Sequence, residues 1–475
     1  MQSGIGNYSN ASTEIEALQQ QGLHFQKRGA HGSAVAVYQR LLALGQDGPA
    51  IRYNLGSALL QLQNPTEALE QFEAGIQLCP QESGLRLGLA NAHKLLGNSA
   101  AAEAALKQEL DLCPESIPAA INLGWLLEEQ NRVPEALVQY RKAMYYQPNH
   151  PVLRWNHGLA CLMLGDYSRG WRDYEHRWAA RQKTKPTDAT PEWRGDTLRG
   201  RRLLLHSEQG FGDTLMFVRF AQMLGHTEEV HLQCQPQLKR LLSQQTGLAS
   251  VVGTYDPAPA HDVHAPLMSL PHLMGLNQES ELSSPAYLEP VQRSLQPLPN
   301  GHRPSIQRVG FVWASAPNSE IADKKSIPLH QFRGLFDTPH CQFYALHMNA
   351  KSSEVAELQR HPNVHDLRES IIDFEDTAGY LSQMDLVITV DTAVAHLAGA
   401  MGKPTWTVLP NAADWRWRMH RSDSPWYPSM RLFRQPRAGD WNRVLEEISH
   451  CLFNHSAQLS TRQLAGQLQQ PAAVL

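Results

Sequence analysis

A period of 34 residues runs through the first third of the chain and constrains its fold more than any other feature. Three tracks share this period: small residues at Gly22, Gly56, Ala90, Gly124 and Gly158, small residues at Ala34, Ala68, Ala102, Ala136 and Gly170, and large residues at Tyr38, Phe72, Leu106, Tyr140 and Tyr174. Small residues let two helices approach closely, and the large residue fills the gap beside them. Pro80, Pro114 and Pro148 then end the second helix of a unit, because proline lacks the N–H group. We predict about five helix-turn-helix units, stacked as a solenoid over residues 13–180.

Composition narrows the class of protein. The chain is 42% hydrophobic with a formal net charge of −4, so it can fill real cores but lacks the basic excess of a nucleic-acid-binding protein. Its six cysteines are scattered without a Cys-x-x-Cys pair, which favours free thiols over a zinc ribbon or a disulfide framework. The start has no basic segment followed by an apolar run, and the most apolar stretch, 386–402, is too short to span a bilayer. We expect a soluble, cytoplasmic protein that is not transmembrane.

The periodicity changes in the second half of the chain. Residues 181–199 are polar with two prolines and are predicted to be a linker. Short apolar runs then alternate with amphipathic segments, as in the βαβ units of a parallel sheet. The candidate strands are 202–207, 230–234, 309–313, 342–346, 386–390 and 405–409. The proline-rich segment 288–305 divides this half into an α/β lobe at 200–300 and another at 301–460, and a ligand cleft is expected at the carboxyl ends of their strands.

The first chemical motif joins a predicted strand to a helix at residues 208–213. Gln209 stands beside two glycines, Gly210 and Gly212, which let the backbone turn tightly and approach a ligand. Asp213 follows at the start of the helix. An aspartate is also a favoured residue for capping a helix N-terminus. The motif therefore leaves open whether Asp213 is a cap or a reacting group.

The second motif, residues 390–400, again places a turn between a strand and a helix. Asp391 ends the strand, and Thr392 is a plausible N-cap whose helix presents free N–H groups suited to a phosphate. His396 lies one turn further along the same face, so it could point toward the same ligand. The alternative is a histidine that is merely packed.

Two further polar clusters each allow two interpretations. Lys324 and Lys325 follow a predicted strand and either form a solvated surface or bring positive charge to a diphosphate. His261 and His264 have a spacing that could suggest a metal, but no cysteine or further carboxylate nearby completes a ligand set, and no Asp-x-Asp motif occurs in this half. We therefore expect no metal, and we expect lysine, histidine and a helix dipole to neutralise a diphosphate.

Tryptophan is concentrated near the C-terminus, at Trp406, Trp415, Trp417, Trp426 and Trp441. Lobe packing explains most of them. The segment Asp414–Trp417, however, follows the carboxyl end of a predicted strand, where Arg416 could pair with phosphate and an indole could stack on a sugar or base. We predict that Arg416 and at least one of Trp415 and Trp417 line the ligand cleft and face the Asp391–His396 helix.

Taken together, the motifs resemble the heptosyltransferase family (glycosyltransferase family 9), fused behind repeats that resemble tetratricopeptide repeats. The motifs occur in order at 208–213, 391–396, 414–417 and 423–428. The resemblance implies a multi-domain fold, in which an all-α solenoid precedes two Rossmann-like lobes of GT-B type. It also implies an inverting, metal-independent transferase that uses a nucleotide-sugar donor and no cofactor. The resemblance does not identify the sugar of the donor, so a hexose and a heptose are both candidates.

Residue roles follow from this resemblance position by position. Asp213 corresponds to the family's candidate base, and Lys325 or its neighbour Lys324 to the lysine on the donor phosphates. Asp391, Thr392 and His396 match the donor motif Asp-Thr/Ser-Gly-x-x-His, in which Ala393 replaces the usual glycine. Gln209, Gly210, Gly212 and His264 are expected near the cleft. The alternative is an inactive scaffold, although a degenerate enzyme would be expected to have lost Lys325, Asp391 or His396.

The repeats suggest a partner. Asn54, Asn122 and Asn156 share one position in the period. In tetratricopeptide arrays that position often grips the backbone of a bound peptide, whereas the plain alternative is a packing scaffold. O-GlcNAc transferases also place such repeats before a GT-B enzyme, so a protein acceptor is credible beside a glycolipid or small-molecule one. The aromatic segment 171–178 predicts a packed junction that would present the acceptor to the cleft.

Overall fold

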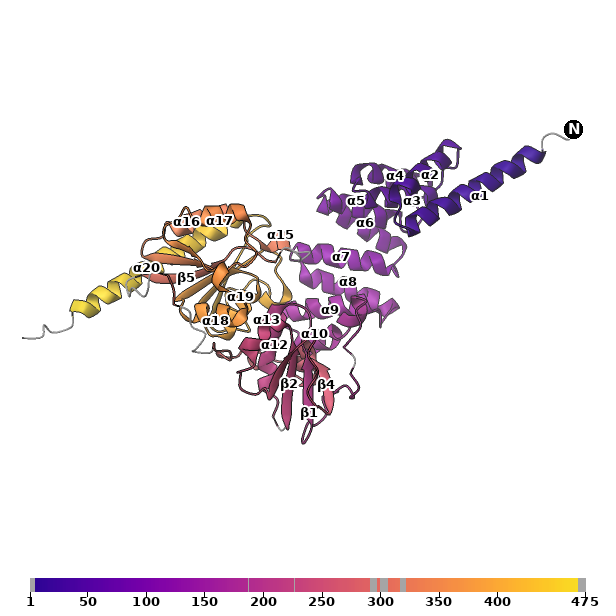
Figure 1. Cartoon of the computed structure of the whole chain (residues 1–475). Coiled ribbons are helices and arrows are strands. Elements are labelled where there is room, and N and C mark those ends of the chain that lie inside the picture. Colours follow the sequence, from indigo (N-terminus) through magenta and orange to yellow (C-terminus); the bar gives the residue numbers. More distant parts are fainter. Residues whose placement is uncertain are drawn as a thin grey trace, which may run out of the picture. The chain divides into compact units, whose positions relative to one another are not determined.

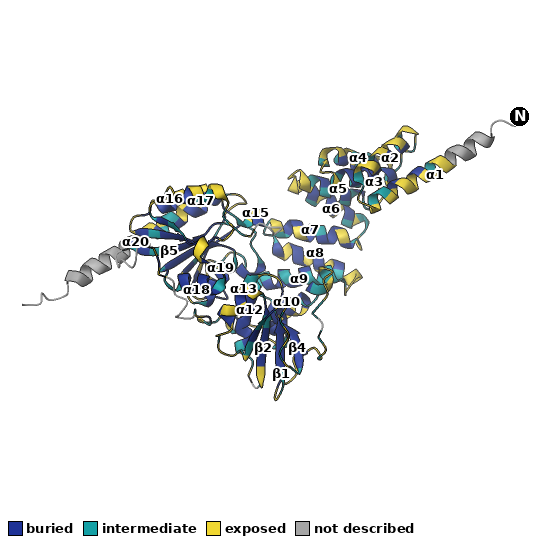
Figure 2. Cartoon of the chain, viewed as in Figure 1, coloured by how far each residue is buried: buried dark blue, intermediate teal, exposed yellow. Residues whose placement is uncertain are grey.

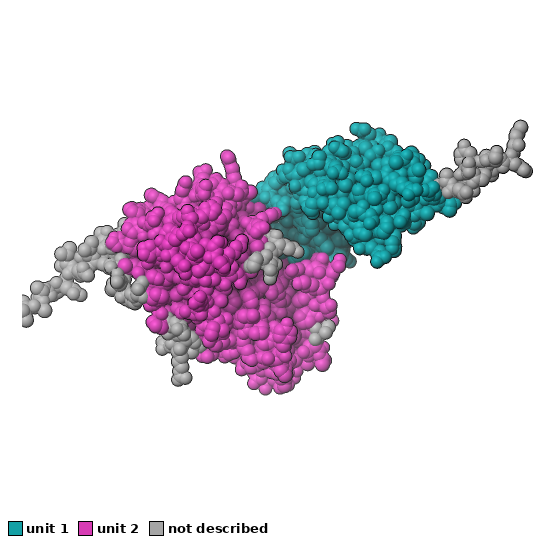
Figure 3. All heavy atoms as spheres, turned by 45° about the horizontal axis from the view of Figure 1, so that its top comes forward, with its two compact units in different colours: residues 1–160 teal, residues 161–475 magenta. Residues whose placement is uncertain are grey.

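The computed structural model describes residues 5–186, 188–225, 227–290, 297–299, 306–316 and 322–468. The chain divides into two compact units, residues 1–160 and 161–475, which Figure 3 shows in different colours. No helix in the described part of the chain combines the length and the apolar character needed to cross a membrane.

The first unit is built from helix pairs, as predicted from the 34-residue period (Figure 1). The helices are α1 (Ile5–Lys27), α2 (His31–Ala43), α3 (Pro49–Gln61), α4 (Pro65–Leu78), α5 (Leu85–Leu95), α6 (Ser99–Leu112), α7 (Ile117–Glu129), α8 (Val133–Tyr146) and α9 (Pro151–Leu164). α9 begins in this unit, and its last residues belong to the second. The second helix of a pair ends just before each of the periodic prolines, since α4, α6 and α8 end two residues ahead of Pro80, Pro114 and Pro148.

Close packing of small against large residues explains the period. A Cβ atom at Gly22 would lie 2.7 Å from Cε1 of Tyr38, and one at Gly124 would lie 2.1 Å from Cε1 of Tyr140. Such distances are far inside van der Waals contact, so only glycine fits opposite these rings. The alanines of the second small-residue track are buried as well, and Figure 2 shows the core between the paired helices.

The second unit begins with two short helices, α10 (Tyr167–Tyr174) and α11 (Arg177–Ala180), and continues into two sheets. The first sheet has the order β3-β2-β1-β4, with β1 (Arg202–His206), β2 (Glu229–Cys234), β3 (Ser250–Gly253) and β4 (Val263–Pro266). Its described pairings are parallel, with Leu203 opposite both Val230 and Val263. Helices α12 (Phe211–Gln222), α13 (Pro236–Leu242) and α14 (Leu270–Leu273) and the 3₁₀ turns η1 (Leu267–Ser269) and η2 (Glu279–Glu281) complete this lobe.

The second sheet has the order β10-β9-β8-β5-β6-β7, and its described pairings are also parallel. The strands are β5 (Gln307–Val312), β6 (Cys341–Ala345), β7 (Val364–Asp366), β8 (Leu386–Val390), β9 (Thr405–Leu409) and β10 (Met430–Arg434). The chain runs outward from β5 and then returns to β8 on its other side. Ligands of open α/β sheets bind at such a switch point, outside the carboxyl ends of the two strands.

Helices flank this second sheet. They are α15 (Ala322–Lys325), α16 (Arg333–Phe336), α17 (Ser352–Leu358), α18 (Phe374–Ser382), α19 (Ala393–Ala400) and α20 (Trp441–Leu468), with 3₁₀ turns η4 (Leu329–Phe332), η5 (Arg368–Ser370) and η6 (Trp415–Trp417). An aromatic cluster that includes Phe311, Trp313, Phe336 and Phe343 fills the core of the lobe. Figure 2 shows the strands of both sheets as buried. The predicted fold class, a helical repeat array followed by two parallel α/β lobes, is confirmed.

The structure differs from the predicted segment boundaries in two places. The array was predicted to reach residue 180, but the compact division falls at residue 160, because α10 and α11 contact the α/β lobes. The predicted linker 181–199 is partly integrated into the first lobe: the N–H of Trp193 donates to the carbonyl of His264 (2.8 Å), and Trp193 is buried. Of the proline-rich segment 288–305, residues 291–296 and 300–305, with the predicted lobe boundary, lie outside the described residues.

Candidate active site

A cavity of about 960 Å³ lies in the second unit, and residues of both lobes border it. Ten of the predicted site residues line it: Gln209, Gly210, Gly212, Asp213, Lys325, Asp391, Thr392, Ala393, His396 and Arg416. They come from the loop after β1 and the start of α12, from α15, from the turn after β8 and the first half of α19, and from η6. Asp213 and Arg416, which are 203 positions apart in the chain, therefore meet in one place, as the strand-end argument predicts. The three asparagines Asn54, Asn122 and Asn156 lie in the first unit.

The loop after β1 sets the position of Asp213. Gly210 precedes α12, and its N–H donates to Oδ2 of Asp213 at 2.9 Å. Gly210 is the N-cap residue, and Asp213 caps the helix start from the third helical position instead of being the N-cap itself. The other carboxylate oxygen, Oδ1, is paired with the guanidinium of Arg416. One oxygen therefore fixes the helix start, and the other faces the cavity beside a cation.

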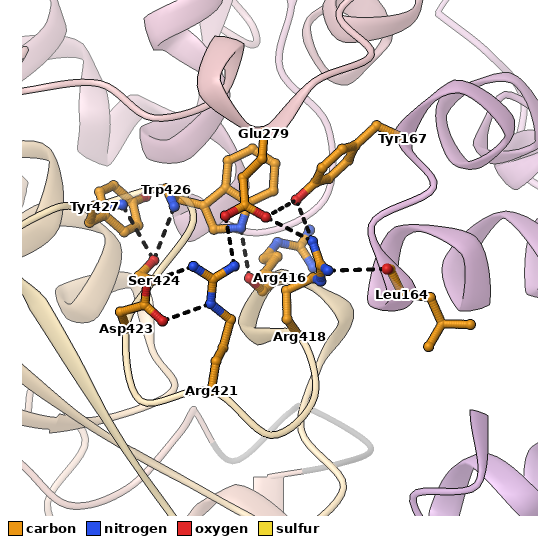
Figure 4. Close-up of polar contacts among 10 residues, drawn as sticks. All are labelled: Leu164, Tyr167, Glu279, Arg416, Arg418, Arg421, Asp423, Ser424, Trp426 and Tyr427. Carbon is orange, nitrogen blue, oxygen red and sulfur yellow. Dashed lines mark hydrogen bonds and ion pairs between the residues drawn. The ribbon is translucent and has the colours of Figure 1, made fainter. Parts of the chain in front are cut away.

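Arg416 lies between two carboxylates. Its Nη1 contacts Oδ1 of Asp414 at 2.7 Å, and its Nη2 contacts Asp213. Burial lowers the pKa of the guanidinium, but the charges of Asp414 and Asp213 more than offset this effect and raise it. The side chain also lies over the ring of Trp415, with Cζ 4.4 Å from the centroid. Its carbonyl accepts a hydrogen bond from Nε1 of Trp426 at 2.7 Å (Figure 4). Arg416 is thus a buried, permanently charged group at the cavity wall.

Lys325 supplies the second cation. Its Nζ lies 2.5 Å from Oδ2 of Asp391, which directly follows β8. Burial lowers the pKa of Lys325, but Asp391 and Asp414 outweigh burial, and the net shift is upward. Lys325 borders the cavity, whereas Lys324 is exposed to solvent beside it. The geometry therefore separates the two lysines that the sequence could not.

The N-terminus of α19 opens toward the same cavity. Thr392 precedes the helix in an extended conformation, and its hydroxyl lies 3.1 Å from that of Thr389. The start of α12 approaches α19 closely: a Cβ at Gly212 would lie 2.7 Å from Cδ2 of His396 and 3.5 Å from Cα of Ala393. Glycine at this position lets the two helix N-termini, each with a partial positive charge, converge on one space.

His396 is buried at the floor of this space. Its Nδ1 lies 3.0 Å from the hydroxyl of Tyr427, and its ring stacks on Trp417 with centroids 5.2 Å apart. Burial lowers the pKa of His396 to about 3. The imidazole is therefore neutral near pH 7 and offers a hydrogen bond rather than a charge. The expectation that histidine helps to neutralise a diphosphate is corrected on this point.

The two tryptophans of η6 pack instead of lining the cavity. Trp417 is fully buried against His396. Trp415 contacts Trp171 and Trp426, with ring centroids 5.5 and 5.9 Å away. Among the described residues that border the cavity, neither tryptophan is present. The part of the prediction that concerned an indole face is thus corrected: the indoles stiffen the segment that carries Arg416.

His264 also lies elsewhere than expected. It belongs to β4, is buried, and its ring packs against His206 at 5.2 Å. His261 pairs with Asp188 at 3.1 Å. His264 therefore belongs to the first sheet and His261 to the segment before β4, and neither is among the described residues that border the cavity. Within the described residues, no cluster of three or more His, Cys, Asp or Glu side chains is placed to hold a metal.

Sequence analysis missed a buried arginine that joins the two lobes. Arg219 of α12 donates to the carbonyls of Leu282 (3.0 Å) and Trp426 (2.7 Å) and to the hydroxyl of Tyr287 (2.9 Å). The available signal was one basic residue within the apolar run 215–221 of this helix, because such a charge is almost never buried without partners. On another side, Arg240 of α13 contacts Asp373 at 2.8 Å, at the start of α18. These contacts hold the walls of the cavity in register.

Comparison with known proteins assigns families to both parts of the chain. Tetratricopeptide repeats match residues 20–83 and 87–151, and glycosyltransferase family 9 (heptosyltransferase) matches residues 312–443. Protein FlbA of Caulobacter vibrioides is 25% identical over 440 residues, which cover 85% of this chain and 72% of FlbA.

Solved structures similar to part of the chain include MamA and a thermophilic tetratricopeptide repeat protein. A crystal structure of MamA is 17% identical and covers 37% of this chain and 98% of MamA, with a TM-score of 0.31. A thermophilic repeat protein of Thermus thermophilus is 19% identical, and the match covers 36% of this chain and 92% of that protein, with a TM-score of 0.31. With its repeats at residues 20–151 and its family match in the second sheet, the chain is a tetratricopeptide repeat protein that carries a glycosyltransferase family 9 (heptosyltransferase) domain.

Proposed function

We propose that the protein transfers a sugar from a nucleotide-sugar donor to an acceptor hydroxyl, with inversion at the anomeric carbon and without a metal. One observation carries this proposal. A single cavity collects a carboxylate, two cations and a helix N-terminus, at Asp213, Lys325, Arg416 and α19. A single displacement needs a base on one side of the anomeric carbon and stabilisation of a departing diphosphate on the other.

The donor diphosphate is proposed to lie against Lys325, Arg416 and the start of α19. Both cations are paired with carboxylates, Lys325 with Asp391 and Arg416 with Asp213 and Asp414. A diphosphate that enters the cavity competes for their N–H groups. The helix N-terminus adds partial positive charge, and His396 adds a neutral hydrogen-bonding group. These groups supply the charge compensation that a metal would otherwise provide.

Asp213 is the proposed base. The acceptor oxygen attacks the anomeric carbon, its proton passes to the Asp213 carboxylate, and the bond from that carbon to the diphosphate oxygen breaks. The products are the glycosylated acceptor and a nucleoside diphosphate. Since Oδ2 holds the Gly210 N–H, Oδ1 is the oxygen free to face the acceptor once the Arg416 guanidinium turns toward phosphate.

Release of nucleotide from a panel of nucleotide sugars tests the proposal, and thermal shifts with UDP, GDP and ADP narrow the donor. Lys325→Ala is expected to weaken nucleotide binding about 10- to 100-fold, the worth of a charged hydrogen bond to phosphate. Lys324→Ala is the matched control, because the neighbouring side chain is exposed outside the cavity. If no nucleotide sugar is turned over or bound, or if the two variants behave alike, the proposed site is wrong.

The repeats are proposed to recruit a protein acceptor. Asn122 on α7 donates through Nδ2 to Oδ1 of Asn91 on α5 at 3.0 Å, so polar side chains of two consecutive repeats are in contact. Trp125, on the same helix as Asn122, is 41% exposed. In the full chain, Asn122→Ala combined with Trp125→Ala should impair transfer to the native protein acceptor and spare hydrolysis of the nucleotide sugar. If both activities are lost equally, or if neither changes, acceptor recruitment through Asn122 and Trp125 is contradicted.

A further inference from the structure

We propose that Tyr174 and Arg177, in the short helices that follow the repeats, are positioning residues of the transferase. They hold the loop 208–210, and through it they set the place of Asp213. The inference rests on the proposed function, because it concerns the geometry of the same cavity. Four observations carry it: a buried ion pair, a left-handed residue held from outside its own loop, a shared aromatic contact, and an anchored helix start.

The ion pair joins α11 to the first residue of the loop. Arg177 is 1% exposed and binds Glu208 through two parallel contacts, Nε to Oε2 at 2.8 Å and Nη2 to Oε1 at 2.7 Å. Its remaining N–H groups donate to Oε1 of Glu175 and Oγ of Ser269, both at 2.8 Å. Ser269 in turn donates to the other oxygen of Glu175 at 2.9 Å. A closed network of this kind orients Glu208 tightly, since every buried polar group has a partner.

The next residue, Gln209, has a backbone conformation that needs support. Its φ is +62°, in the left-handed region that non-glycine residues seldom adopt. Such strain persists where the surrounding structure enforces it. Two contacts do so here: Nε2 of Gln209 donates to the hydroxyl of Tyr174 at 2.9 Å, and the carbonyl of Gln209 accepts from Nε2 of Gln235 at 3.3 Å. Tyr174 therefore belongs to the frame that keeps this turn.

The turn leads directly into the proposed base. Gly210 follows Gln209, and its N–H is the group that Asp213 caps. Gly212 then packs against His396 with no room for a Cβ. A change in the φ of Gln209 would move Gly210 and so displace the Asp213 carboxylate relative to α19. Displacements of about 1 Å lower the rate of an oriented reaction, so the frame matters for chemistry.

Tyr174 also touches the opposite wall. Its ring lies 6.0 Å from that of Trp415, the neighbour of Arg416. One side chain thus contacts the loop before Asp213 and the segment that carries Arg416, the two partners of the ion pair in the cavity. The start of α10 anchors the same segment: Arg418 donates to the hydroxyl of Tyr167 (2.8 Å) and the carbonyl of Leu164 (3.1 Å) and pairs with Glu279 at 3.0 Å (Figure 4).

Tyr174→Phe in the full chain is the decisive variant, because it removes one hydroxyl and keeps the packed ring. We expect faster amide hydrogen exchange in residues 207–213 and a kcat about 3- to 10-fold lower, the worth of one hydrogen bond, with little change in KM for the donor. Tyr167→Phe is the matched control, since it loses a hydroxyl from the same helix but has no contact with Gln209 among the described residues. It should leave exchange in 207–213 unchanged.

A substitution of Arg177 provides a second test of the inference. Arg177→Lys keeps the charge but loses the two-point contact with Glu208, so exchange in 207–213 should again rise and kcat should fall with KM retained. Unchanged exchange and unchanged kcat in Tyr174→Phe would overturn the inference, as would an equal effect of Tyr167→Phe on this loop. If the wild-type protein turned over no nucleotide sugar, the proposed function would fail, while the exchange measurements would still decide whether these residues hold the loop.

Discussion

The substitution Asp213→Asn separates the two roles that Asp213 combines. An asparagine has nearly the same shape, but its amide cannot take up a proton. It also offers one acceptor oxygen where Asp213 uses two, Oδ2 for the Gly210 N–H and Oδ1 for Arg416. The variant therefore keeps either the cap or the contact with the guanidinium. The lost contact should cost about 1–2 kcal/mol of unfolding free energy, the usual worth of a cap or a partly exposed ion pair.

The expected effect on catalysis is larger than the effect on stability. Loss of a general base lowers the rate by about 10²–10⁴-fold, which corresponds to roughly 3–5 kcal/mol in the barrier. A domain with an unfolding free energy of about 5–15 kcal/mol stays folded after a loss of about 1–2 kcal/mol. A fall in the fraction of folded protein therefore cannot mimic the loss of the base.

Asp256→Asn is the control for this substitution. Asp256 also accepts from a backbone N–H three residues earlier, that of Gly253 at 2.8 Å, and pairs with a cation, Lys239 at 2.7 Å. It is 44% exposed, and it is not among the described residues that border the cavity. The assay is nucleotide release at saturating nucleotide sugar, with urea denaturation of both variants. Turnover of Asp213→Asn within about threefold of wild type would refute the base and leave Asp213 a helix cap.

Two other predictions concern packing and pH. Gly212→Ala should lower the unfolding free energy by about 1–3 kcal/mol and reduce turnover, because the new Cβ would meet His396 at 2.7 Å. Gly334→Ala is the control, since its Cβ would meet no described atom beyond its own helix and chain neighbours within 4 Å. It should change the unfolding free energy by less than about 1 kcal/mol in urea denaturation. Burial lowers the pKa of His206, His231 and His264 below the ordinary 6.5, so their contribution to stability is present above that pH and is lost as the pH falls toward their folded-state pKa values. The thermal midpoint should accordingly drop by several degrees between about pH 7.5 and pH 5, and a flat profile would contradict this account.

The strands that were predicted from the sequence are the interior strands of the two sheets. The six candidates overlap β1, β2, β5, β6, β8 and β9, whereas β3, β4, β7 and β10 were missed and all lie at sheet edges. Interior parallel strands are covered on both faces and read as continuous apolar runs. The edge strands are short or carry polar residues, as in Val364–Asp366 and Met430–Arg434, so their apolar signal is weak.

The candidate site was predictable where it depends on strand ends. Asp213 and Asp391 follow strands whose carboxyl ends face one cleft, so topology alone brings them near each other. The orientation of Trp415 and Trp417 was not predictable, because an indole beside Arg416 can either stack on a ligand in the cleft or pack inside the lobe. Their burial depends on Trp171 and His396, and Trp171 in particular is far away in the sequence. Long-range partners of this kind leave no local pattern.

Tyr174 shows this limit most clearly, because the repeat period predicts its size and not its partner. It is the fifth member of the large-residue track, and in earlier repeats the track residue fills the space over a glycine, as Phe72 does over Gly56 with a Cβ distance of 2.7 Å. Tyr174 keeps the same place in its helix, yet its hydroxyl accepts a hydrogen bond from Gln209, 35 residues further along the chain. A period records how neighbouring helices pack, and in the sequence this period continues into α10. After residue 160, α10 packs against the rest of the second unit and no longer only against a neighbouring repeat. The partner of Tyr174, Gln209, lies in the loop that follows β1, so the repeat period does not predict this contact.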